Sequence, residues 1–245
     1  MPQLVTISRY LPILSTLISA AFAWAILARY RLKPQSYQLL WWGIGIITYG
    51  AGTLIESLVT LLGWQVVLFK AWYIAGALLG GAPLAIGTIY LLLGKRVGHI
   101  AVVLLITTVV LTSVFVVLSP VRMELVDPRM LSSKVLVWQS IRRVSPFING
   151  LAALFLIGGA IYSAIRFFSH PESRHVSIGN VFIAAGALLP GIGGMGSRMG
   201  HTELLYIGEF IGLILIWIGY KYCQKPALVP AGEAGMATEP QGLAQ

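Results

Sequence analysis

The chain has 245 residues, of which 57% are hydrophobic and only 10% are charged, and its mean hydropathy is +0.84. A soluble domain could not bury so much apolar surface, and spans of about 20 residues with short loops would use nearly the whole chain, which excludes a soluble catalytic or signalling domain. The net charge is +9, but the basic residues stand at the ends of apolar runs, where they anchor helices against anionic headgroups. We therefore expect the lipid bilayer, and no nucleic acid, as the partner.

Seven apolar runs follow one another, each long enough to cross a bilayer as a helix of about 20 residues. Backbone amides in lipid must find partners within their own segment, which a helix provides. A β-barrel would instead show segments of about 10 residues with alternating polarity. The sequence therefore predicts an all-α fold, a polytopic membrane protein whose residues 1–225 form a seven-transmembrane-helix bundle. The predicted spans are Leu11–Ala28, Leu39–Leu62, Phe69–Leu93, Ile100–Leu118, Phe147–Phe168, Val176–Met195 and Leu204–Tyr220.

Lysine and arginine near the ends of these runs predict the orientation, because short cytoplasmic loops carry an excess of both. The short segments on one side carry only Arg9, Lys70 and Arg198, so we assign that side to the outside. We expect the N-terminus outside and the C-terminus inside the inner (plasma) membrane of a bacterium. The basic residues on the side assigned to the cytoplasm are Arg29, Arg31, Lys33, Lys95, Arg96, Arg166, Arg174, Lys221 and Lys225.

Two segments lie outside the predicted spans. The long connection 119–146 carries further basic residues on the outer side, but long loops follow the charge rule poorly. Within it, Leu131, Val135, Trp138 and Ile141 recur at helical spacing, which predicts an amphipathic helix on the outer surface. Residues 226–245 are rich in Ala, Gly and Pro without periodicity, and we expect a disordered cytoplasmic tail.

A few polar residues inside or beside the spans are the candidates for function, because ionisable groups in lipid are costly. Glu56 precedes the outer end of the second span, and Glu209 follows Glu203 at the outer start of the seventh. At 1.5 Å rise per residue, both carboxylates should lie roughly 9 Å below the outer surface. The other polar residues expected in this layer are Lys70, Asn149, Arg198 and His201.

Proline and glycine predict two further features. Pro190 and the four glycines that follow it up to Gly196 should break or unwind the outer end of the sixth span and expose backbone amides there. Glycines four residues apart, such as Gly208 and Gly212 on the seventh span, should let a neighbouring helix approach closely.

These features together predict an outward-facing pocket. In it, Glu56 and Glu209 are paired with Lys70 or Arg198 and bind an ion, a proton or a small polar ligand. The alternative is that these groups form buried ion pairs that only fix helix packing, and that the glycine-rich stretch is simply a loop.

Other chemistry has little support in the sequence. His99 and His201 lie on opposite sides of the membrane, and His170 and His175 lack a cysteine or carboxylate partner, so we expect no metal site. No catalytic or cofactor motif stands out, and we expect no catalytic residue and no cofactor. Seven spans in this orientation resemble a microbial rhodopsin in outline, but the middle of the seventh span is Gly212–Leu213 and offers no lysine for retinal.

A set of short motifs occupies the third to seventh spans: Trp72-Tyr73, Gly87-Thr88 with Tyr90-Leu91-Leu92, Gly159 with Tyr162-Ser163, Gly179-Asn180, Gly186 to Pro190, Ser197-Arg198 and Tyr206 with Glu209. With these motifs the chain is similar to an uncharacterised family of bacterial seven-span integral membrane proteins that has no assigned function. The resemblance implies the topology and no activity.

We therefore expect a membrane protein that binds or transports a small polar solute or ion in an outer-half pocket. The alternative is a membrane sensor, or an accessory subunit of a membrane complex, without transport or catalytic activity. That alternative requires a homo-oligomer or a membrane partner subunit. An integral membrane enzyme is the third hypothesis, and only His201 with the two carboxylates could supply its chemistry.

Overall fold

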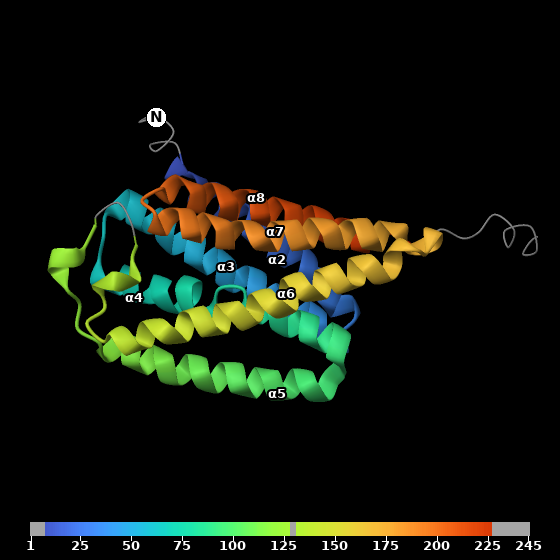
Figure 1. Ribbon diagram of the computed structural model, residues 1–245, viewed down its shortest axis with the longest axis horizontal. Helices are drawn as coiled ribbons and strands as arrows, with labels where there is room; N and C mark the ends of the chain where they lie inside the picture. The colour runs from blue at the N-terminus through green and yellow to red at the C-terminus, as the bar shows by residue number, and fades with distance from the viewer. Residues whose placement is uncertain (1–7, 128–130, 227–245) are drawn as a thin grey trace, which may run out of the picture.

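The computed structural model describes residues 8–127 and 131–226, with the side chain of Arg198 excepted. Its long elements are all helices, which lie together in one bundle (Figure 1). An isolated antiparallel β-bridge joins Val121 to Leu136. The long helices are α2 (Leu11–Leu32), α3 (Tyr37–Leu62), α4 (Val66–Trp72) with its π-helical continuation η1 (Tyr73–Leu79), α5 (Ala82–Leu118), α6 (Val144–Phe168), α7 (Arg174–Arg198) and α8 (Thr202–Cys223).

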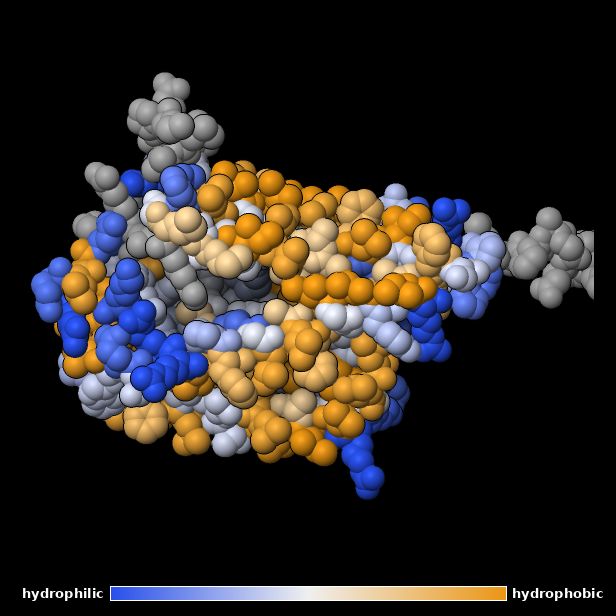
Figure 2. Space-filling view, in the orientation of Figure 1, coloured by the Kyte–Doolittle hydropathy of each residue, from blue (hydrophilic) through white to orange (hydrophobic). Residues whose placement is uncertain are grey.

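The surface of this bundle is that of a membrane protein. Six helical stretches among the described residues are long and apolar enough to cross a membrane. Large hydrophobic side chains such as Leu17, Val103 and Leu154 are 63%, 62% and 64% exposed. Figure 2 shows hydrophobic residues over the middle of the visible face and hydrophilic residues gathered at its two ends. Such a band fits the hydrocarbon layer of a bilayer, and the prediction of an all-helical membrane fold is confirmed at this level.

The two ends of the bundle carry different connections. The end on the left of Figure 1 carries the start of α2 and the connection between α5 and α6, and we call it the loop end. The opposite end carries the end of α8, and we call it the tail end.

The longest apolar stretch, Val66–Leu118, has 53 residues and contains a turn. Gly94, inside α5, has φ 83° and ψ 179°, a backbone conformation that favours glycine. The parts of α5 before and after this turn contact each other, since the rings of Tyr90 and His99 lie with their centroids 5.4 Å apart. The chain therefore turns back on itself near Gly94, as Figure 1 shows.

The connection between α5 and α6 covers part of the loop end. It contains the short 3-10 helices η2 (Met123–Leu125), η3 (Ser133–Val135) and η4 (Gln139–Arg143). The N–H of Arg122 donates a 2.8 Å hydrogen bond to the carbonyl of Val135, so the segment folds back on itself and does not form the single amphipathic helix that was expected. The helically spaced Leu131, Val135 and Ile141 are buried against the bundle. Their spacing thus indicated burial and not a helix.

Helices α7 and α8 make more contacts with each other than any other pair in the described part. A methyl group on Gly212 would come within 2.5 Å of the carbonyl oxygen of Gly186, so the two backbones meet at glycines, as predicted for this span. Helix α7 continues through Pro190 to Arg198, and the predicted break is wrong. The Gly186 carbonyl, which has no helical N–H partner because of Pro190, faces α8 and not lipid, and this packing supports the helix.

Candidate functional site

Glu56 is a buried carboxylate in the loop-end half of α3 and is 5% exposed. Its Oε1 accepts a 2.9 Å hydrogen bond from Nε1 of Trp72. Its Oε2 is buried and accepts no hydrogen bond from an N–H or hydroxyl group of the described residues. A buried polar atom without a partner is costly, so this oxygen is a candidate for binding a proton or a positively charged group.

Close contact between α3 and the α4–η1 segment brings Trp72 to Glu56. A methyl group on Gly52 would come within 3.2 Å of the Cα of Gly76, so these backbones also meet at two glycines. Trp72 lies one helical turn before Gly76, and Glu56 lies one turn after Gly52, so both side chains extend from the same contact. The glycines thus determine the partner of the carboxylate.

Glu209 of α8 is the acidic neighbour of Glu56, and the two carboxyl groups lie close enough to interact. The hydroxyl of Tyr49, on α3, donates a 2.8 Å hydrogen bond to the backbone carbonyl of Glu209. This bond holds α8 against α3 at the level of the two glutamates. The structure therefore brings Glu56 and Glu209 together in the bundle.

A cavity of about 140 Å³ lies beside Glu56 at the loop end of the bundle. This volume has room for several water molecules or a small solute. The wall combines charged, hydroxyl and apolar groups from the start of the chain, from α3 and α8, and from the connection between α5 and α6. The lining residues are Arg9, Glu56, Val59, Thr60, Gly63, Leu131 and Tyr206.

Arg9 is the basic residue that the structure adds to this site. The hydroxyl of Thr60 donates a 3.4 Å hydrogen bond to the Arg9 carbonyl, which links the start of the chain to the end of α3. Arg9 lines the cavity together with Glu56 of α3 and Tyr206 of α8. The sequence indicated Arg9 only as a topology marker, since it precedes the first apolar run. Its position at the cavity depends on how the loop end is folded.

Two other predicted site residues bind backbone carbonyls away from the cavity lining. Nζ of Lys70 donates a 2.7 Å hydrogen bond to the carbonyl of Val117 near the end of α5. Nδ2 of Asn149 donates a 2.8 Å hydrogen bond to the carbonyl of Ala77 in η1. Lys70 thus binds a carbonyl near a helix end, and Asn149 binds one within the π-helical stretch, where regular helical hydrogen bonds are incomplete.

The last two predicted residues lie at the turn between α7 and α8. His201 is exposed, and its Nδ1 lies 3.2 Å from Oε1 of Glu203. Arg198 ends α7, and its side chain is outside the described part of the structure. The structure therefore brings together Glu56 and Glu209 from the predicted set and adds Arg9, Trp72 and Tyr206, while Lys70, Asn149 and His201 have other partners.

Two neighbouring carboxylates, one buried and one half-buried, have a clear electrostatic requirement. If both are ionised they repel, and burying an ion without compensation costs about several kcal/mol. A positive charge, either a proton or a cation, must therefore accompany the pair. Over the described residues, the one side-chain ion pair within 4.0 Å is that of His201 and Glu203, so neither Glu56 nor Glu209 has a basic side chain at that distance. The same residues contain no group of three or more His, Cys, Asp or Glu side chains that could hold a metal ion.

Comparison of the chain with models of known protein families gives no match, and comparisons with characterised proteins and with solved structures give none either.

Proposed function

We propose that the chain crosses a bacterial inner membrane seven times, with its N-terminus outside. As one straight helix, Val66–Leu118 would measure about 80 Å at 1.5 Å per residue, more than twice the ~30 Å hydrocarbon layer. The turn at Gly94 supports the division of this stretch into two spans. Counted over the short connections alone, lysine and arginine are in excess at the tail end, which supports its assignment to the cytoplasm.

Labelling of single cysteines tests this topology. In a Cys223→Ala background, we expect a membrane-impermeant maleimide to label Ser132→Cys, at the loop end, in cells whose inner membrane is intact. Ser169→Cys, in the connection between α6 and α7, should react only after the membrane is opened. Labelling of both positions from the same side would contradict the seven-span arrangement, and the reverse pattern would contradict the orientation.

We further propose that a small monovalent cation binds between Glu56 and Glu209, beside the loop-end cavity, in exchange with protons. The observation that supports this most strongly is the unpartnered Oε2 of Glu56, buried beside a second carboxylate and beside a cavity. A cation there would neutralise the repulsion between the two glutamates and coordinate oxygen atoms, which are the ligands that hard cations prefer. The hydroxyl of Tyr206 lines the same cavity and offers a further oxygen.

Thermal unfolding of the purified protein in chloride salts tests this binding. A ligand present at one hundred times its Kd stabilises the folded state by about 2.7 kcal/mol. We expect sodium, lithium or potassium chloride to raise Tm relative to choline chloride at equal ionic strength. Because protons compete for the same oxygens, the gain should shrink as the pH is lowered.

Substitutions of the two glutamates test whether the cation binds between them. Glu56→Gln and Glu209→Gln should each lose the salt-specific gain in Tm. Glu203→Gln, which lies on the same helix as Glu209 but beside exposed His201, should keep it. An unchanged gain in the double variant Glu56→Gln/Glu209→Gln would show that the cation binds elsewhere. A rise with choline as large as with the inorganic cations would show that there is no such site.

Transport across the membrane would be a further step beyond binding. Uptake of radiolabelled sodium into proteoliposomes, driven by a proton gradient, should be faster than in liposomes without protein and should be abolished by Glu56→Gln. Binding without uptake would instead support the sensor or accessory subunit.

A further inference from the structure

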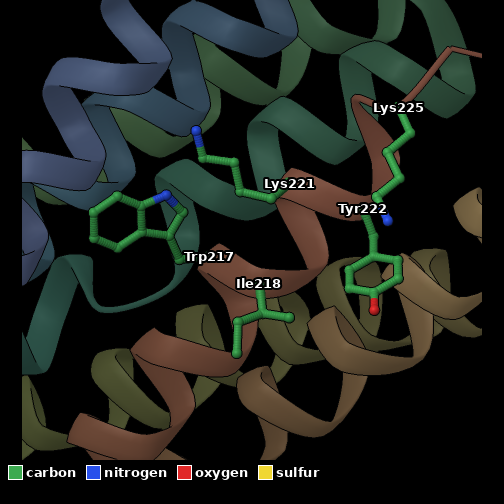
Figure 3. A pocket seen from close by; sticks show the side chains of 5 residues that line it. All are labelled: Trp217, Ile218, Lys221, Tyr222 and Lys225. Atoms are coloured by element: carbon green, nitrogen blue, oxygen red, sulfur yellow. The ribbon is translucent and has the colours of Figure 1, made fainter.

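A second surface feature lies on α8 at the tail end, away from the carboxylates. It is a shallow groove of about 270 Å³. Figure 3 shows Lys221 extending on the side of Trp217 and Lys225 lying beside Tyr222, with Ile218 between the two aromatic side chains. The lining residues are Trp217, Ile218, Lys221, Tyr222 and Lys225.

The apolar wall of this groove is held in place. The ring of Trp217 stacks on that of Phe22 in α2, with centroids 5.3 Å apart and planes 9° from parallel. Nζ of Lys225 lies 4.2 Å from the ring centroid of Tyr222, which positions this ammonium group at the edge of the groove.

Among residues 8–127 and 131–226, no carboxylate pairs with the ammonium groups of this groove. Lys221 and Lys225 lie one helical turn apart, where like charges repel. Of the acidic residues in the described part, only Glu172 lies in a tail-end connection, and it forms no ion pair with a described lysine or arginine within 4.0 Å. The two ammonium groups therefore favour an external anion.

We propose that this groove binds an anionic phospholipid, with an acyl chain against Ile218 and Trp217 and its phosphate at the ammonium groups of Lys221 and Lys225, which border the groove. The tail end is where the apolar band of the bundle stops, which is the depth of lipid headgroups. Lysine, tryptophan and tyrosine together form the usual anchor at this depth. A free phosphate would gain nothing from the apolar wall, whereas a phospholipid uses both parts of the groove. The proposal does not depend on the carboxylate pair.

Native mass spectrometry of the full chain, released from nanodiscs of equal parts phosphatidylglycerol and phosphatidylcholine, tests this site. We expect phosphatidylglycerol to remain bound in preference to phosphatidylcholine. Each basic residue near a membrane surface strengthens anionic lipid binding about fivefold, so Lys221→Ala/Lys225→Ala should weaken retention roughly 30-fold. Lys33→Ala/Arg96→Ala is the matched control, because it removes two charges from the same end but none from the groove, and it should retain the lipid.

Two outcomes would overturn the proposal. Equal loss of phosphatidylglycerol in both double variants would mean that the lipid responds to the overall charge of the tail end and not to this groove. Equal retention of the two lipids by the unaltered protein would mean that the groove does not select an anionic headgroup. A monodisperse elution profile and an unchanged helical circular dichroism spectrum establish that the variants are folded.

Discussion

The contact between α7 and α8 gives a sharp prediction, because one helix carries glycines in two different environments. A methyl group on Gly186 would come within 2.6 Å of the carbonyl oxygen of Gly212 and 2.9 Å of a side-chain carbon of Ile216. Gly191 and Gly194 of the same helix have nothing within 4 Å of such a methyl group. The same substitution to alanine should therefore have opposite effects at positions one or two turns apart.

The magnitude follows from the distances. A carbon and a carbonyl oxygen at rest lie roughly 3.3 Å or more apart, so Gly186→Ala must push the two helices apart by several tenths of an ångström. Overpacking of this kind costs about 1–3 kcal/mol. At Gly191 or Gly194, alanine meets no neighbour and adds its better helix propensity, which contributes up to about 1 kcal/mol in favour of folding.

Reversible unfolding in mixed micelles, titrated with sodium dodecyl sulfate, measures these differences in the free energy of unfolding. Gly212→Ala, on the other side of the contact, should cost a similar amount to Gly186→Ala. The double variant should cost less than the sum of the two, because the first methyl group already separates the helices. If Gly191→Ala destabilises the protein as much as Gly186→Ala, then the loss at Gly186 does not come from its close contact with α8, and the prediction is refuted.

Trp72→Phe should destabilise the protein by about 1–3 kcal/mol in the same titration, because the buried Oε1 of Glu56 loses its hydrogen-bond donor. Trp64→Phe is the control, since Nε1 of Trp64 has no partner in the described part. Equal losses in the two variants would contradict the role of the Trp72 bond. Gly94→Ala should lower the free energy of unfolding by about 1–2 kcal/mol, because alanine is strained at φ 83°. Gly158→Ala in α6 is the control and should leave it unchanged, because the added methyl group meets open space. A neutral Gly94→Ala would show that the turn tolerates another conformation.

The positions of the helices could be predicted from the sequence because a long apolar run in lipid must satisfy its backbone hydrogen bonds within itself, which a helix does. The run predicted from Leu39 to Leu62 lies within the helix Tyr37–Leu62, and the one from Leu204 to Tyr220 lies within Thr202–Cys223. The common depth of Glu56 and Glu209 followed from the rise per residue alone.

The partners in the site could not be predicted in the same way. Trp72 reaches Glu56 because Gly52 and Gly76 meet, and a pattern along one chain does not say which glycines of two helices will face each other. Arg9 joins the cavity through the fold of the loop end, which no periodicity describes. Pro190 was expected to interrupt its helix, but whether a proline does so depends on whether a neighbouring helix covers the carbonyl it leaves without a partner.

The glycine contacts between α7 and α8 also determine how the carboxylate pair can separate. Backbones in direct contact slide or part less readily than helices that meet through long side chains, so this hairpin should shift as one rigid arm. Glu209 travels with that arm, whereas Glu56 stays with α3. Widening between the two acids would break the Tyr49 hydrogen bond to the Glu209 carbonyl, which joins this hairpin to α3, while the ring contact of Trp217 with Phe22 joins it to α2.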